Sequence, residues 1–309
     1  MQTKSHINFD PAFRWLTLAG GLAILFLVGS ICYTLIIGAM PALKKFGIGF
    51  LFSQSWDPAF KEFGALSSVY GTLVSTAIGM LIAVPLSLVI ALFLVELAPP
   101  AVSRLVGGAI ELLAAIPSII YGMWGLFVFA PFLADHVQPW LTSVAPGLPL
   151  FQGPPIGIGM LAAGIILALM VLPFITSVTR DVFQMVPEVV KESAYGMGST
   201  TWEVTRKVTL PYGIQGVVGA CFLGLGRAIG ETMAVTFVIG NRHEISASLF
   251  AAGNSITSTL ANEFTEASDD LYLAALIELG LVLFGITLVI QFIARWWLRR
   301  TARKLGAVR

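Results

Sequence analysis

The sequence predicts an all-α polytopic membrane protein with six transmembrane helices. Of its 309 residues, 57% are hydrophobic and only 11% are charged, whereas soluble domains carry about 25% charged residues. The mean hydropathy is +0.87, and a soluble chain of this composition would expose large apolar patches and aggregate. Six apolar runs are long enough to cross a bilayer. They must be helical, because an open strand edge is not viable in lipid.

The six runs are separated by polar or proline-rich segments. The first run is longer than a signal-peptide core of about 7–15 residues, and only a weak cleavage pattern follows it, so we predict an uncleaved span. Pro85, Pro117 and Pro173 lie inside runs and predict kinked helices. The expected spans are residues 15–38, 69–95, 105–132, 157–178, 214–240 and 272–297.

Lysine and arginine residues gather on one side of these spans. If the N-terminus is cytoplasmic, thirteen of the 18 lie in the cytoplasm, four lie outside, and Arg227 lies in the membrane. Because cytoplasmic loops are enriched in Lys and Arg, both termini are predicted to be cytoplasmic. We expect the proline-rich second outer loop to be irregular and the third to form short helices. The outer loops are residues 39–68, 133–156 and 241–271, and the main cytoplasmic loop is residues 179–213.

Several classes of function are disfavoured by the composition. The net charge is +1 and no basic run is interleaved with aromatic residues, so no nucleic-acid partner is expected. The two cysteines lie in apolar runs and are expected to be small buried hydrophobes. The three histidines have no metal-ligand spacing, and no H-E-x-x-H motif is present. No aspartate lies in a predicted span, as an intramembrane aspartyl protease would require. We therefore predict no catalytic residue and no metal site.

The main cytoplasmic loop is polar enough to lie outside the membrane and apolar enough to dock. Its pattern predicts an amphipathic helix over residues 187–197, which Gly196 and Gly198 can end. The loop therefore either docks on a partner or rests on lipid. The side chains available to anchor this helix are Val189, Val190, Ala194 and Tyr195.

A second short helix is expected after these glycines. Thr200 or Thr201 can cap it, and Glu203 would lie in its first turn. Pro211 is expected to stop this helix near the membrane. The predicted product is a helix–turn–helix that projects from the cytoplasmic face.

This loop resembles the coupling motif of type I ATP-binding-cassette importer permeases. The motif reads E-A-A, three residues, G, nine residues, I, one residue, L-P, and only Ser for Ala and Val for Ile depart from it here. The resemblance implies a type I ABC importer permease fold and a loop that fits a groove on a separate ATPase, which would bind ATP and Mg. The chain itself has no G-x-x-x-x-G-K-[ST] phosphate loop. The matching residues are Glu192, Ser193, Ala194, Gly198, Val208, Leu210 and Pro211.

The fifth predicted span contains Arg227 and Glu231. A charge at the bilayer centre costs roughly 2.5–3.5 kcal/mol, and such residues usually face a bundle interior or an aqueous path. On a continuous helix, residues four apart share one face. One interpretation is therefore a structural ion pair, with Gly226 and Gly230 letting another helix approach. The other is that Arg227 lines a translocation path and binds an oxyanion through its planar fork, while Glu231 holds it in place.

Two further acids lie in predicted spans. Glu111 is about two turns inside the third span, and Glu278 is about two turns inside the sixth. Neither has an obvious partner in the sequence. We expect both to form hydrogen bonds between helices.

Four blocks make the resemblance more specific. GRAIGETMAVTFVIGN, ESAYGMGSTTWEV, ELLAAIPSIIYGMWGLFVFAP and GNSITSTLANEF are similar to the PstC-type permeases of bacterial phosphate importers, and the likeness runs over residues 46–295. It implies import of inorganic phosphate across the cytoplasmic membrane. It also implies a homologous second permease, two ATPase subunits, and a soluble phosphate-binding protein that docks on the outer loops near residues 246–264.

The resemblance leaves two alternatives open. The cargo can be another oxyanion, such as phosphonate, sulfate or molybdate, or the chain can be a phosphate-sensing membrane subunit. The domain organisation it implies has three parts. Residues 1–68 hold the first helix and first outer loop, residues 69–298 form the five-helix transporter domain, and residues 299–309 form a basic cytoplasmic tail.

Overall fold

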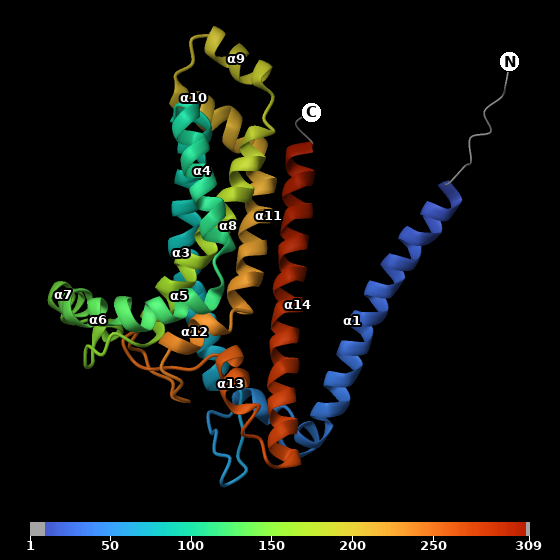
Figure 1. Ribbon diagram of the computed structural model, residues 1–309, viewed down its shortest axis with the longest axis vertical. Coiled ribbons are helices and arrows are strands. Elements are labelled where there is room, and N and C mark those ends of the chain that lie inside the picture. The colour runs from blue at the N-terminus through green and yellow to red at the C-terminus, as the bar shows by residue number, and fades with distance from the viewer. Residues whose placement is uncertain (1–9, 307–309) are drawn as a thin grey trace.

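The computed structural model describes residues 10–306, so the first nine residues of the N-terminal segment and the last three of the predicted tail lie outside the description. Within this range the chain is helical, apart from loops and one isolated β-bridge between Asp57 and Glu62. In Figure 1 the helices α3, α4, α8, α11 and α14 run along one direction, with α9 at one end and α13 towards the other. The α-helices are α1 Asp10–Phe46, α2 Gly49–Phe52, α3 Leu66–Leu92, α4 Pro100–Ala115, α5 Ser118–Trp124, α6 Ala130–Phe132, α7 Gln138–Val144, α8 Met160–Gln184, α9 Glu188–Gly196, α10 Thr201–Val204, α11 Leu210–Ile229, α12 Met233–Val238, α13 Ile256–Glu263 and α14 Asp270–Gly306.

Wider or tighter helical turns connect several of these helices. The π-helical turns do not end the helices they follow, so one helix runs from Leu66 to Leu97, another from Ser118 to Val144, and another from Thr201 to Ile229. Single π-turns inside α-helices are often found at functional sites. The π-helical turns are η1 Phe93–Leu97, η2 Gly125–Phe129, η3 Leu133–Val137 and η5 Thr205–Thr209, and η4 Pro149–Phe151 is a 3-10 turn.

Six helices of the described chain are long and apolar enough to cross a membrane, which confirms the predicted number. The first, second, fourth and sixth agree with the sequence prediction except at their ends. α3 and α8 continue through Pro85 and Pro173. Towards the C-terminus, α14 stays helical to Gly306, through most of the predicted tail. The six helices are Phe13–Phe46, Leu66–Leu97, Ser118–Val144, Met160–Gln184, Thr201–Ile229 and Asp270–Arg300.

The third predicted span, residues 105–132, is wrong as a single helix. α4 ends at Ala115, Ile116 and Pro117 are extended, and α5 begins at Ser118. The ring of a proline disfavours the helical conformation of the residue before it, so Pro117 separates two helices where a kink was expected. Figure 1 shows the segment from α5 to α7 turned away from the direction of α4. The second outer loop is also more helical than expected, because α7 continues to Val144.

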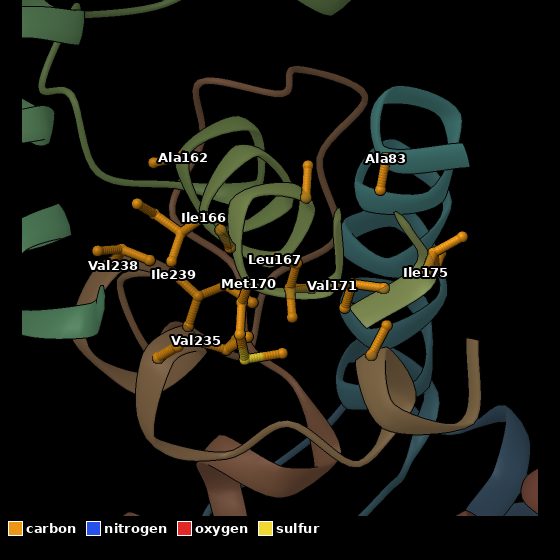
Figure 2. Packing of buried hydrophobic residues seen from close by; sticks show 14 of the residues in the cluster. Ala83, Ala162, Ile166, Leu167, Met170, Val171, Ile175, Val235, Val238 and Ile239 are labelled. Carbon is orange, nitrogen blue, oxygen red and sulfur yellow. The ribbon is translucent and has the colours of Figure 1, made fainter. Parts of the chain in front are cut away.

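The core forms around α8, and 67% of its most apolar window is buried. Figure 2 shows apolar side chains of α8 packed against residues of α12 and against Ala83 of α3. Small residues bring the helices close: a Cβ added to Gly79 of α3 would lie 3.1 Å from Leu167 Cβ, so Gly79 must remain small. The labelled core residues of α8 are Ala162, Ile166, Leu167, Met170, Val171 and Ile175.

The first helix, α1, is the least buried of the six. Only 6% of its most apolar window is buried, and Figure 1 shows it splayed away from the bundle over most of its length. It packs on α14 near its C-terminal end, where Ala39 and Ala42 are fully buried. Gly38 lies against Ile277 of α14. One face of α1 near this end is therefore packed, and the rest is open.

Candidate functional site

The predicted cytoplasmic loop folds as a helix, a glycine turn and a second helix. α9 spans Glu188–Gly196, in agreement with the prediction, and Gly198 has a positive φ of +86° that favours glycine. Thr200 is the N-cap of α10. Its hydroxyl accepts a hydrogen bond from the Glu203 N–H, while the Glu203 carboxylate accepts one from the Thr200 N–H (3.0 Å). This capping box places the turn of the coupling motif between two well-defined helices.

The prediction that Pro211 stops the second helix is wrong. α10 passes through η5 into α11 without a break, and Pro211 lies in the first turn of α11. A proline is tolerated in a first turn because its missing N–H would have no partner there. The π-turn η5 directly precedes α11, and it gives Pro211 such a first-turn position inside a continuous helix. The coupling loop is thus joined rigidly to the fifth span.

The motif residues divide into an exposed set and a packed set. Glu192, Ser193 and Gly198 are exposed, whereas Ala194 is buried against the chain. Of the four apolar side chains predicted as anchors for docking, Val189, Val190 and Tyr195 are exposed and available to a partner or to lipid, whereas Ala194 is buried within this chain. Met197 at the turn is 82% exposed. Several exposed apolar side chains on one short segment support an interaction site. The remaining motif residues Val208 and Leu210 are partly buried and Pro211 is exposed.

The fifth predicted span, residues 214–240, is two helices. α11 ends at Ile229 and α12 begins at Met233, and the segment between them is not helical. Gly230 follows α11, and its N–H donates to the Gly226 carbonyl (3.3 Å). The prediction that Arg227 and Glu231 share one face of a continuous helix is therefore wrong. Glycine is favoured just after the end of a helix, as at Gly230, and threonine is favoured just before the start of one, as at Thr232.

Each charge lies where a helix end stabilises it. Arg227 is in the last turn of α11, and the Glu231 Oε1 accepts a hydrogen bond from the N–H of Ala234 in the first turn of α12 (3.2 Å). A cation at a helix C-terminus or an anion at an N-terminus gains about 0.3–1 kcal/mol. The Glu231 carbonyl accepts a hydrogen bond from the Thr257 hydroxyl (2.7 Å). In residues 10–306 no ion pair involves Arg227.

The Arg227 side chain lies on a face that this chain does not cover. Arg227, Leu223 and Met233 are all exposed, and the guanidinium lies within electrostatic range of the Tyr121 hydroxyl on α5. Beside Arg227 on α11, a Cβ added to Gly226 would lie 3.3 Å from Gln291 Nε2 of α14. The close approach of another helix expected at Gly226 and Gly230 is not seen: Gly226 meets only the end of the Gln291 side chain, and only α11 itself lies within 4 Å of a Cβ added to Gly230. The geometry leaves the guanidinium available to a ligand.

The two other intramembrane acids have different surroundings. Glu111 of α4 accepts a hydrogen bond from Arg180 Nη2 of α8 (3.1 Å), which confirms the interhelical bond expected for it. Glu278 of α14 is buried and its Oε2 has no hydrogen-bond partner in the described chain, so the prediction is wrong there. Glu278 borders a mostly apolar cavity of about 550 Å³ that lies between α1 and α14. Within residues 10–306, no group of His, Cys, Asp and Glu could hold a metal ion.

The sequence did not predict a polar cluster that joins the expected outer loops. The Glu263 carboxylate accepts hydrogen bonds from Trp56 Nε1 (2.6 Å) and the Tyr272 hydroxyl (2.7 Å), and lies 2.9 Å from His243 Nε2. The Trp56 ring stacks on His243 with centroids 5.1 Å apart. The cluster joins the first outer loop, the third outer loop, α13 and α14. Trp56 and Glu263 alone are 207 positions apart, so no local pattern could reveal the cluster.

These contacts set the ionisation of Glu263. Burial acts to raise the pKa of this carboxyl, but the hydrogen bonds from His243, Tyr272 and Trp56 outweigh it and hold the pKa below its usual value. The ionised carboxylate is therefore the form that the cluster stabilises. Through Glu263, the cluster holds the segment over residues 246–264 against the first predicted outer loop and α14. The sequence predicts that a partner binds this segment.

Comparison with known proteins assigns the family. Residues 83–303 match the family described as "Binding-protein-dependent transport system inner membrane component". The chain belongs to this permease family. The matched range contains both the coupling loop and the break between α11 and α12. The chain is thus a non-enzymatic, multi-pass inner-membrane subunit of an ABC importer, a class of transporter that works with ATPase and binding-protein partners.

Relatives along the whole chain confirm the resemblance predicted from the motifs. The chain is 55% identical to the "Phosphate transport system permease protein PstC" of Mesorhizobium japonicum, over 96% of this chain and 92% of that protein. It is 50% identical to the protein of the same description from Pasteurella multocida, over 98% of this chain and 95% of that protein.

Solved structures agree on the fold. A bacterial alginate ABC transporter in complex with its pentasaccharide-bound periplasmic protein matches with a TM-score of 0.63 and 20% identity, over 95% of this chain and 97% of that chain. The inward-facing MetNI methionine ABC transporter matches with a TM-score of 0.55 and 20% identity, over 77% of this chain and 94% of that chain. The predicted ABC importer permease fold is therefore confirmed.

Proposed function

We propose that this chain imports inorganic phosphate across the cytoplasmic membrane by alternating access, as one permease subunit of an ATP-driven importer. The observation that carries the substrate is the 55% identity with a phosphate permease over 96% of this chain. Both termini face the cytoplasm in this proposal, as the distribution of Lys and Arg predicts. Residues 69–298 act as the transporter domain.

The complete importer contains three kinds of partner for this chain. A homologous second permease covers the open face around Arg227, because an exposed guanidinium in the membrane needs either water or another protein beside it. Two ATPase subunits, which hold ATP and Mg, bind the cytoplasmic loops. A soluble phosphate-binding protein docks on the outer face, on the segment over residues 246–264. The exposed apolar side chains around Met197 support the ATPase contact.

Arg227 is the residue that meets phosphate in the membrane. A guanidinium hydrogen-bonds a phosphate oxyanion in a bidentate fashion, and this replaces part of the hydration that the anion loses. Glu231 fixes the break that presents Arg227, since it caps α12 (3.2 Å to the Ala234 N–H) and receives Thr257 on its carbonyl. Its negative charge nearby also keeps phosphate from binding too tightly to leave.

Energy reaches the spans through the motif residues of the coupling loop, which are Glu192, Ser193, Ala194, Gly198, Val208, Leu210 and Pro211. Closure of the ATPase dimer moves α9, and the continuous helix from Thr201 to Ile229 carries that movement to the turn that bears Arg227. The spans then open outward and accept phosphate from the binding protein. Hydrolysis of ATP returns the cavity to the cytoplasmic side.

The test is ATP-driven uptake in proteoliposomes that contain this chain with its co-encoded permease, ATPase and binding protein. Labelled phosphate competes with unlabelled phosphate, sulfate, molybdate and phosphonate. Uptake blocked only by unlabelled phosphate is the expected result. ATP-driven uptake of another oxyanion would overturn the substrate and keep the coupling proposal, whereas a complex with no substrate-dependent uptake would favour a sensing subunit.

A further inference from the structure

One buried ion pair joins the coupling helix α9 to the end of another span. Lys191 Nζ lies 2.6 Å from Glu96 Oε1, and the side chains are only 15% and 6% exposed. The Thr209 hydroxyl donates to the same oxygen (2.8 Å). Glu96 lies in η1 at the cytoplasmic end of α3, and Thr209 lies in η5 at the start of the fifth span. A single carboxylate oxygen thus connects three segments.

This contact is unusual among those of α9. Within residues 10–306, the bond from Lys191 is the one side-chain hydrogen bond that links α9 to another helix, because the Ser193 hydroxyl bonds within α9 itself. Most other side chains of α9 are exposed, apart from Ala194. α8 and α10 are joined to α9 by short stretches of chain, but α3 is not. Glu96 is therefore the polar connection between α9 and α3.

We propose that Lys191 and Glu96 are positioning residues for energy coupling, which pass the movement of α9 to α3 as well as to the fifth span. This inference rests on the proposed function, since it assumes that ATP closure moves α9. A buried ion pair resists separation, because a charge left unpaired in a low-dielectric site is strongly destabilising. α3, α9 and the start of the fifth span must therefore move as one unit. Without the pair, α9 can move while α3 lags behind.

The decisive variant replaces both charges at once. Lys191→Met with Glu96→Gln removes the ionic bond without leaving a buried charge unpaired, so the loop can keep its fold. The reversed pair, Lys191→Glu with Glu96→Lys, restores the attraction. The matched control is Lys207→Met, which removes a lysine from an exposed ion pair on the same loop, Lys207 Nζ to Glu203 Oε1 at 3.4 Å. Exposed pairs of this kind contribute little.

The whole importer is reconstituted in proteoliposomes, and three quantities are measured: ATPase subunits bound, ATP hydrolysed, and phosphate imported per ATP. We expect the double neutral variant to bind ATPase and hydrolyse ATP within about twofold of the wild type, while phosphate imported per ATP falls about tenfold or more, the scale of a lost hydrogen bond to a charged group. The reversed pair recovers most of the loss, and Lys207→Met has no effect.

Three results would overturn the inference. The first is a double variant that imports as much phosphate per ATP as the wild type. The second is an equal loss in Lys207→Met. The third is a double variant that no longer binds ATPase, which would mean that the pair only maintains the shape of the loop. Failure of the proposed function looks different, because the wild-type importer itself then moves no phosphate. If the wild type imports another oxyanion, the same ratio is measured with that anion.

Discussion

Arg227 lies in the last turn of one helix and Glu231 precedes the next, so two charges four positions apart flank a break in the chain's fifth span. The carboxylate of Glu231 is engaged by the N–H of Ala234, while Arg227 forms no ion pair in the described chain. Broken helices in transporters place helix ends beside the substrate. The break therefore positions a cation that the chain itself does not neutralise.

Replacement of Arg227 by alanine should reduce phosphate uptake about tenfold or more while the complex still assembles, because a charge-assisted bond to the anion is lost. Arg227→Lys should retain part of the activity, since the charge remains but the planar fork does not. Uptake in proteoliposomes and co-purification of the subunits measure both effects. Arg242→Ala, in an exposed ion pair with Glu244, is the control. Collapse of the complex in Arg227→Ala would instead support a structural role.

Replacement of Gly198 by arginine should weaken ATPase binding. The φ of +86° strains any other residue, and nothing in the chain lies within 4 Å of an added Cβ, so the new side chain projects outward. Gly198→Ala introduces the strain of roughly 1 kcal/mol without the bulk and separates the two effects. Binding is measured by co-purification of the ATPase. Unchanged binding in Gly198→Arg would count against the coupling loop assignment.

Replacement of Gly71 by alanine should destabilise the outer end of α3. An added Cβ would collide with the backbone carbonyl of Asn254, just before α13, and overpacking of this kind costs about 1–3 kcal/mol. Gly285→Ala on α14 is the matched control, because nothing lies within 4 Å of its added Cβ. Gly285→Ala should be neutral or slightly stabilising, since alanine is the better helix former. Thermal unfolding of the purified complex measures both, and an equal Tm for the two variants would contradict the prediction.

The outer polar cluster should lose stability in acid. The pKa of Glu263 is lower in the folded chain than the usual 4.5, so its contribution is complete above pH 4.5 and is lost as the pH falls through the lowered pKa. Glu263→Gln should reduce stability at neutral pH by about 1–2 kcal/mol, because hydrogen bonds to a charged group are weakened. It should also flatten the acid dependence.

Thermal unfolding across pH tests this expectation. Glu266→Gln is the control, because Glu266 is exposed and its carboxylate makes no hydrogen bond in the described chain. A Glu263→Gln complex that keeps the full acid dependence of the wild type would show that another group is responsible.

The features that the sequence predicted correctly depend on short-range rules. Apolar runs of sufficient length predict spans, and the amphipathic pattern over residues 187–197 predicts α9. The Thr200–Glu203 capping box needs only residues three apart. The helix end at Gly198 is also predicted locally, because a left-handed residue after a helix is usually glycine. Each of these signals lies within about twenty residues.

The features that were missed or wrong depend on tertiary structure or on competing local signals. An apolar run from residue 214 to 240 concealed the break, although Gly230 and Thr232 favour helix ends there. Pro117 was predicted to kink a span, but the extended residue before it separates two helices. The pairing of Lys191 with Glu96 joins residues 95 positions apart. No periodicity in the chain could indicate that contact.

The open first helix has a consequence for how the protein is made. α1 packs mainly on α14, yet the ribosome produces every other described helix between the two. During that time α1 must stay in the bilayer without its partner, held by its own side chains. Its sequence suits this, because no charged residue occurs between Arg14 and Lys44. The packing of α1 on α14 can therefore form only after α14 has been synthesised and inserted.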